Sequence, residues 1–90
     1  MSKYQSVWDA ISDTPEEATN MKMRSALMMG IVRRVEEMEG TQAEKAERFG
    51  LTQPRLNDLL KGRIGKFSLD ALVNLAVRVG MKVELEIKAA

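Results

Sequence analysis

The chain has 90 residues, a formal net charge of +1, no cysteine and no histidine. This length suits a single domain. The missing cysteines exclude disulfides, thiolate metal sites and cysteine nucleophiles, and the missing histidines remove the commonest general base and metal ligand. No apolar run is long enough to span a membrane, and no cationic, apolar leader is present. We therefore expect a bacterial cytoplasmic protein that is not an enzyme and needs no metal or cofactor.

The distribution of charge is more informative than its sum. Residues 1–20 carry a net charge of −3, from one basic and four acidic side chains, whereas residues 42–66 carry +3, from six basic and three acidic side chains. An acidic arm beside a basic block favours two partners, with the basic block facing phosphates. An ordinary solvated surface explains the same pattern equally well.

The first helix is predicted over residues 15–39, before Gly40. Residues 14–17, Thr-Pro-Glu-Glu, form a helix start: the threonine can cap, proline suits the first position, and the second glutamate completes a capping box. A break within residues 19–23 is an alternative, because Thr and Asn are weak helix formers. Apolar residues recur along this helix at helical spacing: Leu27, Met28, Ile31, Val32, Val35 and Met38.

Two short helices follow. The second begins after Thr41, which forms a capping box with Glu44, and ends at Gly50, which is placed to take the left-handed conformation. The third begins after Thr52, tolerates Pro54 in its first turn, and ends before the next glycine, at position 62.

A loop over residues 63–67 leads to Ser68, which caps a fourth helix ending near Gly80. Its predicted buried side consists of Leu69, Leu72, Val73, Leu75, Ala76 and Val79. Residues 81–87 then alternate between apolar and charged side chains, the pattern of a half-buried strand.

The second and third helices carry apolar and small residues at offsets that would fix their crossing. Ala46 allows close approach of the third helix, and Gly50 lies four residues later in the turn. The apolar positions that would join the two helices are Phe49, Leu51, Leu56 and Leu59. A rigid crossing lets the third helix project as a unit into the major groove of DNA. Residues 41–62 therefore predict a helix-turn-helix.

Residues 41–53, TQAEKAERFGLTQ, resemble the start of this motif in the xenobiotic-response-element (XRE) regulators, a family that includes the lambdoid phage repressors and Cro. The resemblance implies a mainly α, lambda repressor-like bundle of four to five helices. It also implies that Gln42 braces Gln53 and touches a phosphate, and that Gln53 pairs with a base, usually adenine. Lys45 departs from the family, which usually has an apolar residue there; its stem would lie along the core with the ammonium in water.

A narrower resemblance is to the HigA-type antitoxins, one branch of that family. It rests on SVWDAI at 6–11 with PEEA at 15–18, TQPRLNDL at 52–59, FSLDALVNL at 67–75 and VEL at 83–85. It implies a repressor of its own operon that also neutralises a small basic toxin, a HigB-like ribonuclease of the RelE superfamily.

The exposed face of the third helix is the predicted reading surface. Arg55 would pair with guanine or hold a phosphate, and Asn57 would pair with adenine. Asp58 would accept from a cytosine amino group or orient Arg55, and Pro54 would touch a thymine methyl. A solvated polar side chain is an equal interpretation for Asn57 and Asp58. The base contacts are thus assigned to Gln53, Pro54, Arg55, Asn57 and Asp58, and the phosphate contacts to Thr41, Gln42, Thr52, Lys61, Arg63 and Lys66.

We divide the single domain, 1–90, into an acidic arm (1–20), a core (21–80) and a C-terminal dimerisation strand (81–90). The strand lacks a partner in its own chain, and antiparallel pairing with a second copy would satisfy its amides. The apolar residues that would form this dimer strand are Val83, Leu85 and Ile87. Pairing with residues 4–7 of either chain is the alternative.

Charge restricts the register of such a pair. Centring on Leu85 opposes Glu84 to Glu86 and Lys82 to Lys88, whereas centring on Glu84 sets Lys82 against Glu86 and leaves one self-facing Glu84 pair. An off-centre register is favoured. A homodimer would read two half-sites of a palindromic operator in double-stranded DNA.

Four residues of the arm fall on one helical face: Tyr4, Val7, Trp8 and Ile11. Either they fold onto the chain's own core, which is slightly favoured, or they bind the toxin, because an acidic arm with aromatic anchors suits a basic partner.

The expected function is therefore that of a nucleoid-associated repressor and antitoxin. The alternatives are a stand-alone XRE-family or phage-type repressor without a toxin, and a helical module that binds only proteins.

Overall fold

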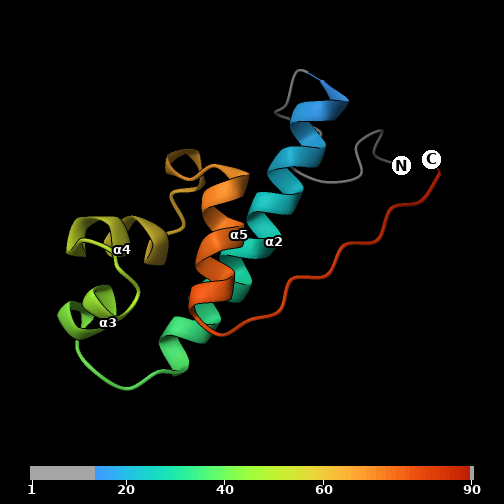
Figure 1. Ribbon diagram of the computed structural model, residues 1–90. Coiled ribbons are helices and arrows are strands. Elements are labelled where there is room, and N and C mark those ends of the chain that lie inside the picture. The colour runs from blue at the N-terminus through green and yellow to red at the C-terminus, as the bar shows by residue number, and fades with distance from the viewer. Residues whose placement is uncertain (1–13, 90) are drawn as a thin grey trace.

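The computed structural model describes residues 14–89. Helices follow one another in chain order: α2 (Pro15–Glu37), α3 (Gln42–Arg48), α4 (Gln53–Leu60), the short 3-10 helix η1 (Ile64–Lys66) and α5 (Leu69–Arg78). Helices α2 and α5 lie side by side, and α3 and α4 form a second pair on one flank of them (Figure 1). The predicted mainly α helix bundle is confirmed for this part of the chain.

Helix α2 begins at the predicted cap, where Thr14 Oγ1 accepts the Glu17 amide at 3.1 Å. It is continuous from Pro15 to Glu37, so the alternative of a break within residues 19–23 is wrong. The polar side chain that raised that alternative supports the helix instead: Asn20 Oδ1 accepts from Arg24 Nε, four residues on, at 2.6 Å. The helix ends two residues earlier than predicted, because Met38 is already extended.

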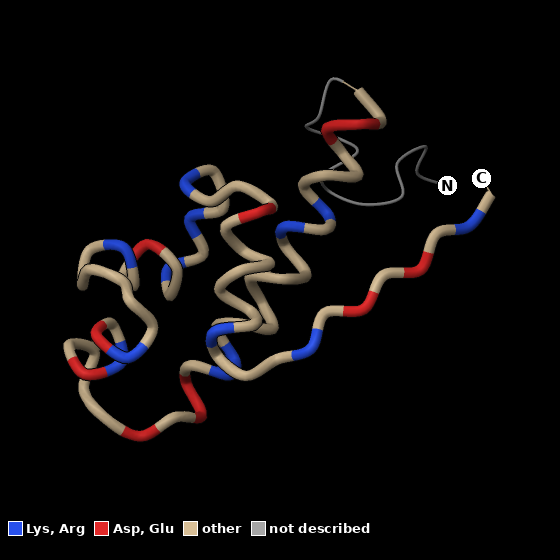
Figure 2. Tube along the Cα trace, in the orientation of Figure 1, with Lys and Arg blue, Asp and Glu red and all other residues tan. Residues whose placement is uncertain are grey.

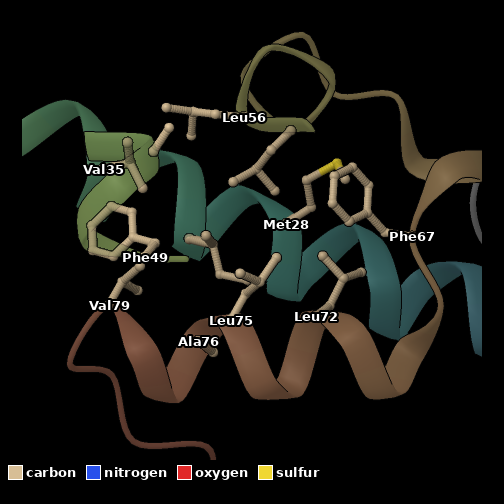
Figure 3. Packing of buried hydrophobic residues seen from close by; sticks show 12 residues of the cluster. Met28, Val35, Phe49, Leu56, Phe67, Leu72, Leu75, Ala76 and Val79 are labelled. Carbon is tan, nitrogen blue, oxygen red and sulfur yellow. The ribbon is translucent and has the colours of Figure 1, made fainter. Parts of the chain in front are cut away.

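One hydrophobic cluster joins α2, α3, α4, α5 and the loop before α5 (Figure 3). Helix α2 contributes Ile31 and Val35, both fully buried, and α5 packs against them. No polar or charged residue within the described range is buried. The buried members of the cluster are Met28, Ile31, Val35, Ala46, Phe49, Leu56, Leu59, Phe67, Leu72, Leu75, Ala76 and Val79.

Arginines at the edge of this cluster hold the carbonyl ends of helices. Arg34 Nε donates to the Val79 carbonyl at the end of α5 (3.0 Å), and Arg78 Nη1 donates to the Phe49 carbonyl at the end of α3 (3.3 Å). A cation is favourable at a helix C-terminus, where carbonyls lack intrahelical partners. These bonds fix the α3–α4 pair and α5 relative to one another.

The predicted C-terminal strand does not form among residues 14–89. Residues 81–89 are extended but form no strand within the described chain. Met81 donates its amide to the Ala76 carbonyl at 2.9 Å, and no later residue has a backbone hydrogen bond inside residues 14–89. A strand needs a neighbouring strand, and the described chain offers none. Pairing with a second copy stays a prediction.

Candidate nucleic-acid interface

The turn between α3 and α4 is tight and hydrogen-bonded. Gly50 has φ +69° and ends α3, with its amide on the Glu47 carbonyl (3.1 Å) and the Leu51 amide on the Ala46 carbonyl (2.8 Å). This pair of bonds is a Schellman motif, which requires a left-handed residue. The predicted junction is confirmed, because its apolar residues are buried or packed against the core: Ala46, Phe49, Leu51, Leu56 and Leu59.

The open end of α4 presents polar and small side chains to solvent. Thr52 caps this helix by accepting the Arg55 amide at 3.2 Å, and Gln53 and Pro54 are its first two residues and are exposed. Because a helix N-terminus has unpaired amides and a positive dipole end, it suits a negatively charged ligand. Gln53, exposed in the first turn of this helix, is thus placed so that its side-chain amide can contact a ligand bound at the helix N-terminus.

Helix α3 begins with the same geometry. Thr41 and Glu44 form the predicted capping box, with the Glu44 amide on Thr41 Oγ1 (3.1 Å) and the Thr41 amide on Glu44 Oε1 (3.0 Å). The hydrogen bond from the Thr41 backbone amide, and after it one with the Thr41 side chain, hold the pKa of the Glu44 carboxyl below its usual value. The box orders the segment that carries Thr41 and Gln42, both exposed and both predicted phosphate contacts.

Arg55 is engaged within the protein. Its Cζ lies 3.9 Å from the centroid of the Phe67 ring, and its Nη1 donates to the Lys66 carbonyl at 2.5 Å. A guanidinium stacked on an aromatic face gains a cation–π attraction. The side chain thereby ties the first turn of α4 to the loop before α5.

Asp58 is paired with Arg63 and not with Arg55. Asp58 Oδ1 lies 2.8 Å from Arg63 Nη1, and the Asp58 side chain is only 17 % exposed. The prediction that Asp58 orients Arg55 is therefore wrong. Gly62, with φ +70°, reverses the chain after α4, so that the Arg63 amide bonds the Asp58 carbonyl at 3.0 Å and its guanidinium reaches the carboxylate.

Basic residues lie along α4 and the segment that follows it, with acidic residues among them on α3 and α4 (Figure 2). Lys61 and Lys66 are exposed, and Arg63 is about half exposed despite its bond to Asp58. Asn57 is half-buried, so it extends less far from the surface than Gln53. The positively charged groups thus lie on the segment between α4 and α5, next to the open face of α4.

Phe67 and Arg24 were not predicted to support this site. Phe67 was predicted only to end the loop before Ser68; its side chain is buried and its ring lies against the Arg55 guanidinium. Arg24 Nη1 donates to the Ile64 and Phe67 carbonyls, at 3.3 and 3.1 Å. An aromatic residue next to the Ser68 cap was the only local signal for the first, and nothing near Arg24 in the sequence indicated the second.

The four predicted toxin-binding residues, Tyr4, Val7, Trp8 and Ile11, lie outside the described residues. Within 14–89 no helix has the length and apolar character needed to cross a bilayer. The same range contains no group of three or more acidic side chains that could hold a metal ion.

Two short helices joined by a glycine turn, with a projecting second helix and a basic flank, define a helix-turn-helix DNA-binding fold. A family model described as a helix-turn-helix domain matches residues 10–88, and the chain belongs to that family. No curated protein matches the chain in a sequence comparison. The family match confirms the predicted motif and carries no assignment to the antitoxin branch.

Proposed function

We propose that this protein is a sequence-specific transcriptional repressor that places α4 in the major groove of double-stranded DNA. The observation that carries the proposal is the exposed Gln53 at the N-terminus of a helix whose opposite side is locked into the core by Leu56 and Leu59. An amide held on a rigid helix can pair with the N6 and N7 edge of adenine.

The remaining contacts divide by chemistry. Asn57 and Pro54 would read neighbouring bases, and the hydroxyls of Thr41 and Thr52 would donate to phosphates while still accepting their capping amides. The side chains proposed to hold the DNA backbone are Thr41, Gln42, Thr52, Lys61, Arg63 and Lys66. Such contacts position the helix without reading sequence.

Arg55 and Asp58 are proposed to contact other residues of the protein rather than DNA bases. A base contact by Arg55 requires its guanidinium to leave both the Phe67 ring and the Lys66 carbonyl. A cytosine contact by Asp58 requires its carboxylate to leave Arg63. We therefore propose that Arg55 holds the loop that carries Lys66 in place. A demonstrated contact between Arg55 and a base would overturn this role.

The repressor is proposed to act as a homodimer on a palindromic operator. One recognition helix covers few base pairs, and a two-fold dimer reads two half-sites. Support comes from the exposed apolar side chains of the C-terminal segment, Val83, Leu85 and Ile87.

Gln53→Ala tests the base contact. We expect a loss of roughly 1–3 kcal/mol on operator DNA taken from upstream of the gene and little loss on random DNA. Asn74→Ala, an exposed amide on α5, is the matched control and should change neither affinity. Titrations at several salt concentrations measure both. An equal loss on both DNAs contradicts base reading, and binding without salt dependence contradicts phosphate contact.

We further propose that the repressor is the antitoxin of a toxin–antitoxin pair. The support is the resemblance to HigA-type antitoxins and the net negative charge of residues 1–20. Co-expression with a neighbouring gene for a small basic protein should give a complex and relieve its toxicity. If no such gene lies beside this one, or its product does not co-purify, the stand-alone repressor is favoured.

A further inference from the structure

A second apolar surface lies away from α4, between α2, α5 and the C-terminal segment. It is a groove of about 620 Å³ lined on the helices by Met23, Leu27, Gly30 and Val73. Met81, Val83 and Leu85 border it from the segment, which runs back along the helix pair without forming a strand (Figure 1). Leu27 and Met81 pack against the edge of the core, but within residues 14–89 most of the apolar lining of the groove is only partly buried, so it can accept a further occupant.

The apolar side chains of the C-terminal segment become more exposed toward its end. The exposed fraction rises along it from 41 % at Val83 to 72 % at Leu85 and 83 % at Ile87. The amides and carbonyls of residues 82–89 have no backbone partner among residues 14–89. Within residues 14–89, the last apolar side chains and the backbone edge of the segment are therefore left largely open to solvent.

We propose that a second copy of this chain occupies the groove, through an antiparallel two-stranded ribbon whose two-fold axis passes at Val83. This inference rests on the proposed homodimer and specifies its contact. Met81 of each copy then faces the partner's Leu85. Because a two-fold axis perpendicular to the ribbon keeps both apolar faces on one side, Leu85 and Ile87 of each copy cover the groove of the other.

Charge selects this register. With the axis at Val83, Lys82 of each copy faces the partner's Glu84, and no like charges are opposed. An axis at Leu85 opposes the partner's Lys88 to Lys82, and an axis at Glu84 or Glu86 sets that glutamate against itself. Like charges directly opposite one another destabilise a strand pair. An axis at Ile87 avoids repulsion but pairs only the end of the segment and leaves the groove open.

Cysteine cross-linking tests the register directly, because the natural chain has no cysteine. Directly opposed residues of an antiparallel pair lie about 4.5–5.5 Å apart between Cα atoms, within disulfide range. The full chain is prepared as four single variants, at Val83, Glu84, Leu85 and Glu86, and is oxidised mildly. We expect Val83→Cys to give several-fold more disulfide-linked dimer than the other three. A maximum at Glu84, Leu85 or Glu86 overturns the register.

Two further measurements test the occupant. In the variant Val7→Cys/Val83→Cys, an intrachain disulfide without cross-linked dimer means that the chain's own first residues fill the groove, which overturns the proposal. A monomer by sedimentation equilibrium at micromolar concentration overturns it as well.

The outcomes separate this inference from the repressor proposal. A dimer that cross-links at Val83 but binds no DNA supports the contact and contradicts the repressor. A monomer that binds operator DNA supports DNA binding and contradicts the contact.

Discussion

The α3–α4 pair and the C-terminal segment have equally clear sequence patterns but different structural outcomes. The pair forms with its predicted caps, turn and buried junction. The segment alternates as regularly, yet residues 81–89 hold no regular structure within the described chain. Helices satisfy their hydrogen bonds locally, whereas a strand depends on a partner. The α3–α4 pair is therefore stabilised by contacts within its own chain, whereas the C-terminal segment is predicted to need a second chain to form a strand.

The largest expected effect is a loss of stability at the α3–α4 junction that a matching change in the C-terminal segment does not cause. Leu56→Ala removes a fully buried side chain from the junction and should lower the free energy of unfolding by about 2–5 kcal/mol. Leu85→Ala removes an exposed one and should leave the unfolding of the dilute monomer unchanged while weakening the dimer. Urea denaturation at two protein concentrations measures both effects. If the two variants lose similar unfolding free energy as dilute monomers, the stated difference between the two regions is wrong.

The turn gives the next largest effect. Gly50→Ala forces a side chain into the left-handed region at φ +69° and should cost about 1–2 kcal/mol. The added Cβ itself has room, since its nearest neighbour is Arg78 Nη1 at 3.7 Å. Gly65→Ala is the control, because φ there is not positive and the space is open. If the two variants melt alike, the turn is not strained.

Arg55→Ala should have a smaller effect on stability, about 0.5–1 kcal/mol for the lost contact with the Phe67 ring. If Arg55 braces the loop, operator and random DNA should lose similar affinity, because the segment that would be displaced carries Lys66, a proposed phosphate contact. Parallel titrations with both DNAs measure this. A selective loss on the operator would instead restore the predicted base contact to Arg55.

The smallest effect concerns pH. The pKa of Glu44 is lowered from 4.5 by its bonds with Thr41, so the stability that the capping box contributes is complete above the unfolded-state pKa. It is lost as the pH falls through the lower pKa of the folded state. Glu44→Gln should therefore reduce the difference between urea midpoints at about pH 6 and about pH 3. Thr41→Ser keeps both hydrogen-bonding groups and should retain that difference; equal differences in all three proteins would exclude the box as its source.

The residues whose partners are close in sequence were predictable. Thr41, Thr52 and Ser68 each accept an amide three residues on, as their positions before helix starts indicated. The apolar spacing likewise identified the junction residues around Gly50. Helix α2 shows the limit of such reasoning: local propensity left a break within residues 19–23 as an alternative, whereas the helix is continuous there and Asn20 accepts a hydrogen bond from Arg24.

The sequence by itself determined the helix starts, the glycine turn and the apolar sides that make residues 41–62 a helix-turn-helix. Only the tertiary structure decided that Arg55 lies on Phe67, that Asp58 pairs with Arg63, and that residues 81–89 remain without a strand partner among residues 14–89. The physical reason is the range of the interactions. Caps and turns close within a few residues, whereas a stacked guanidinium or a strand pair depends on where the fold brings distant segments.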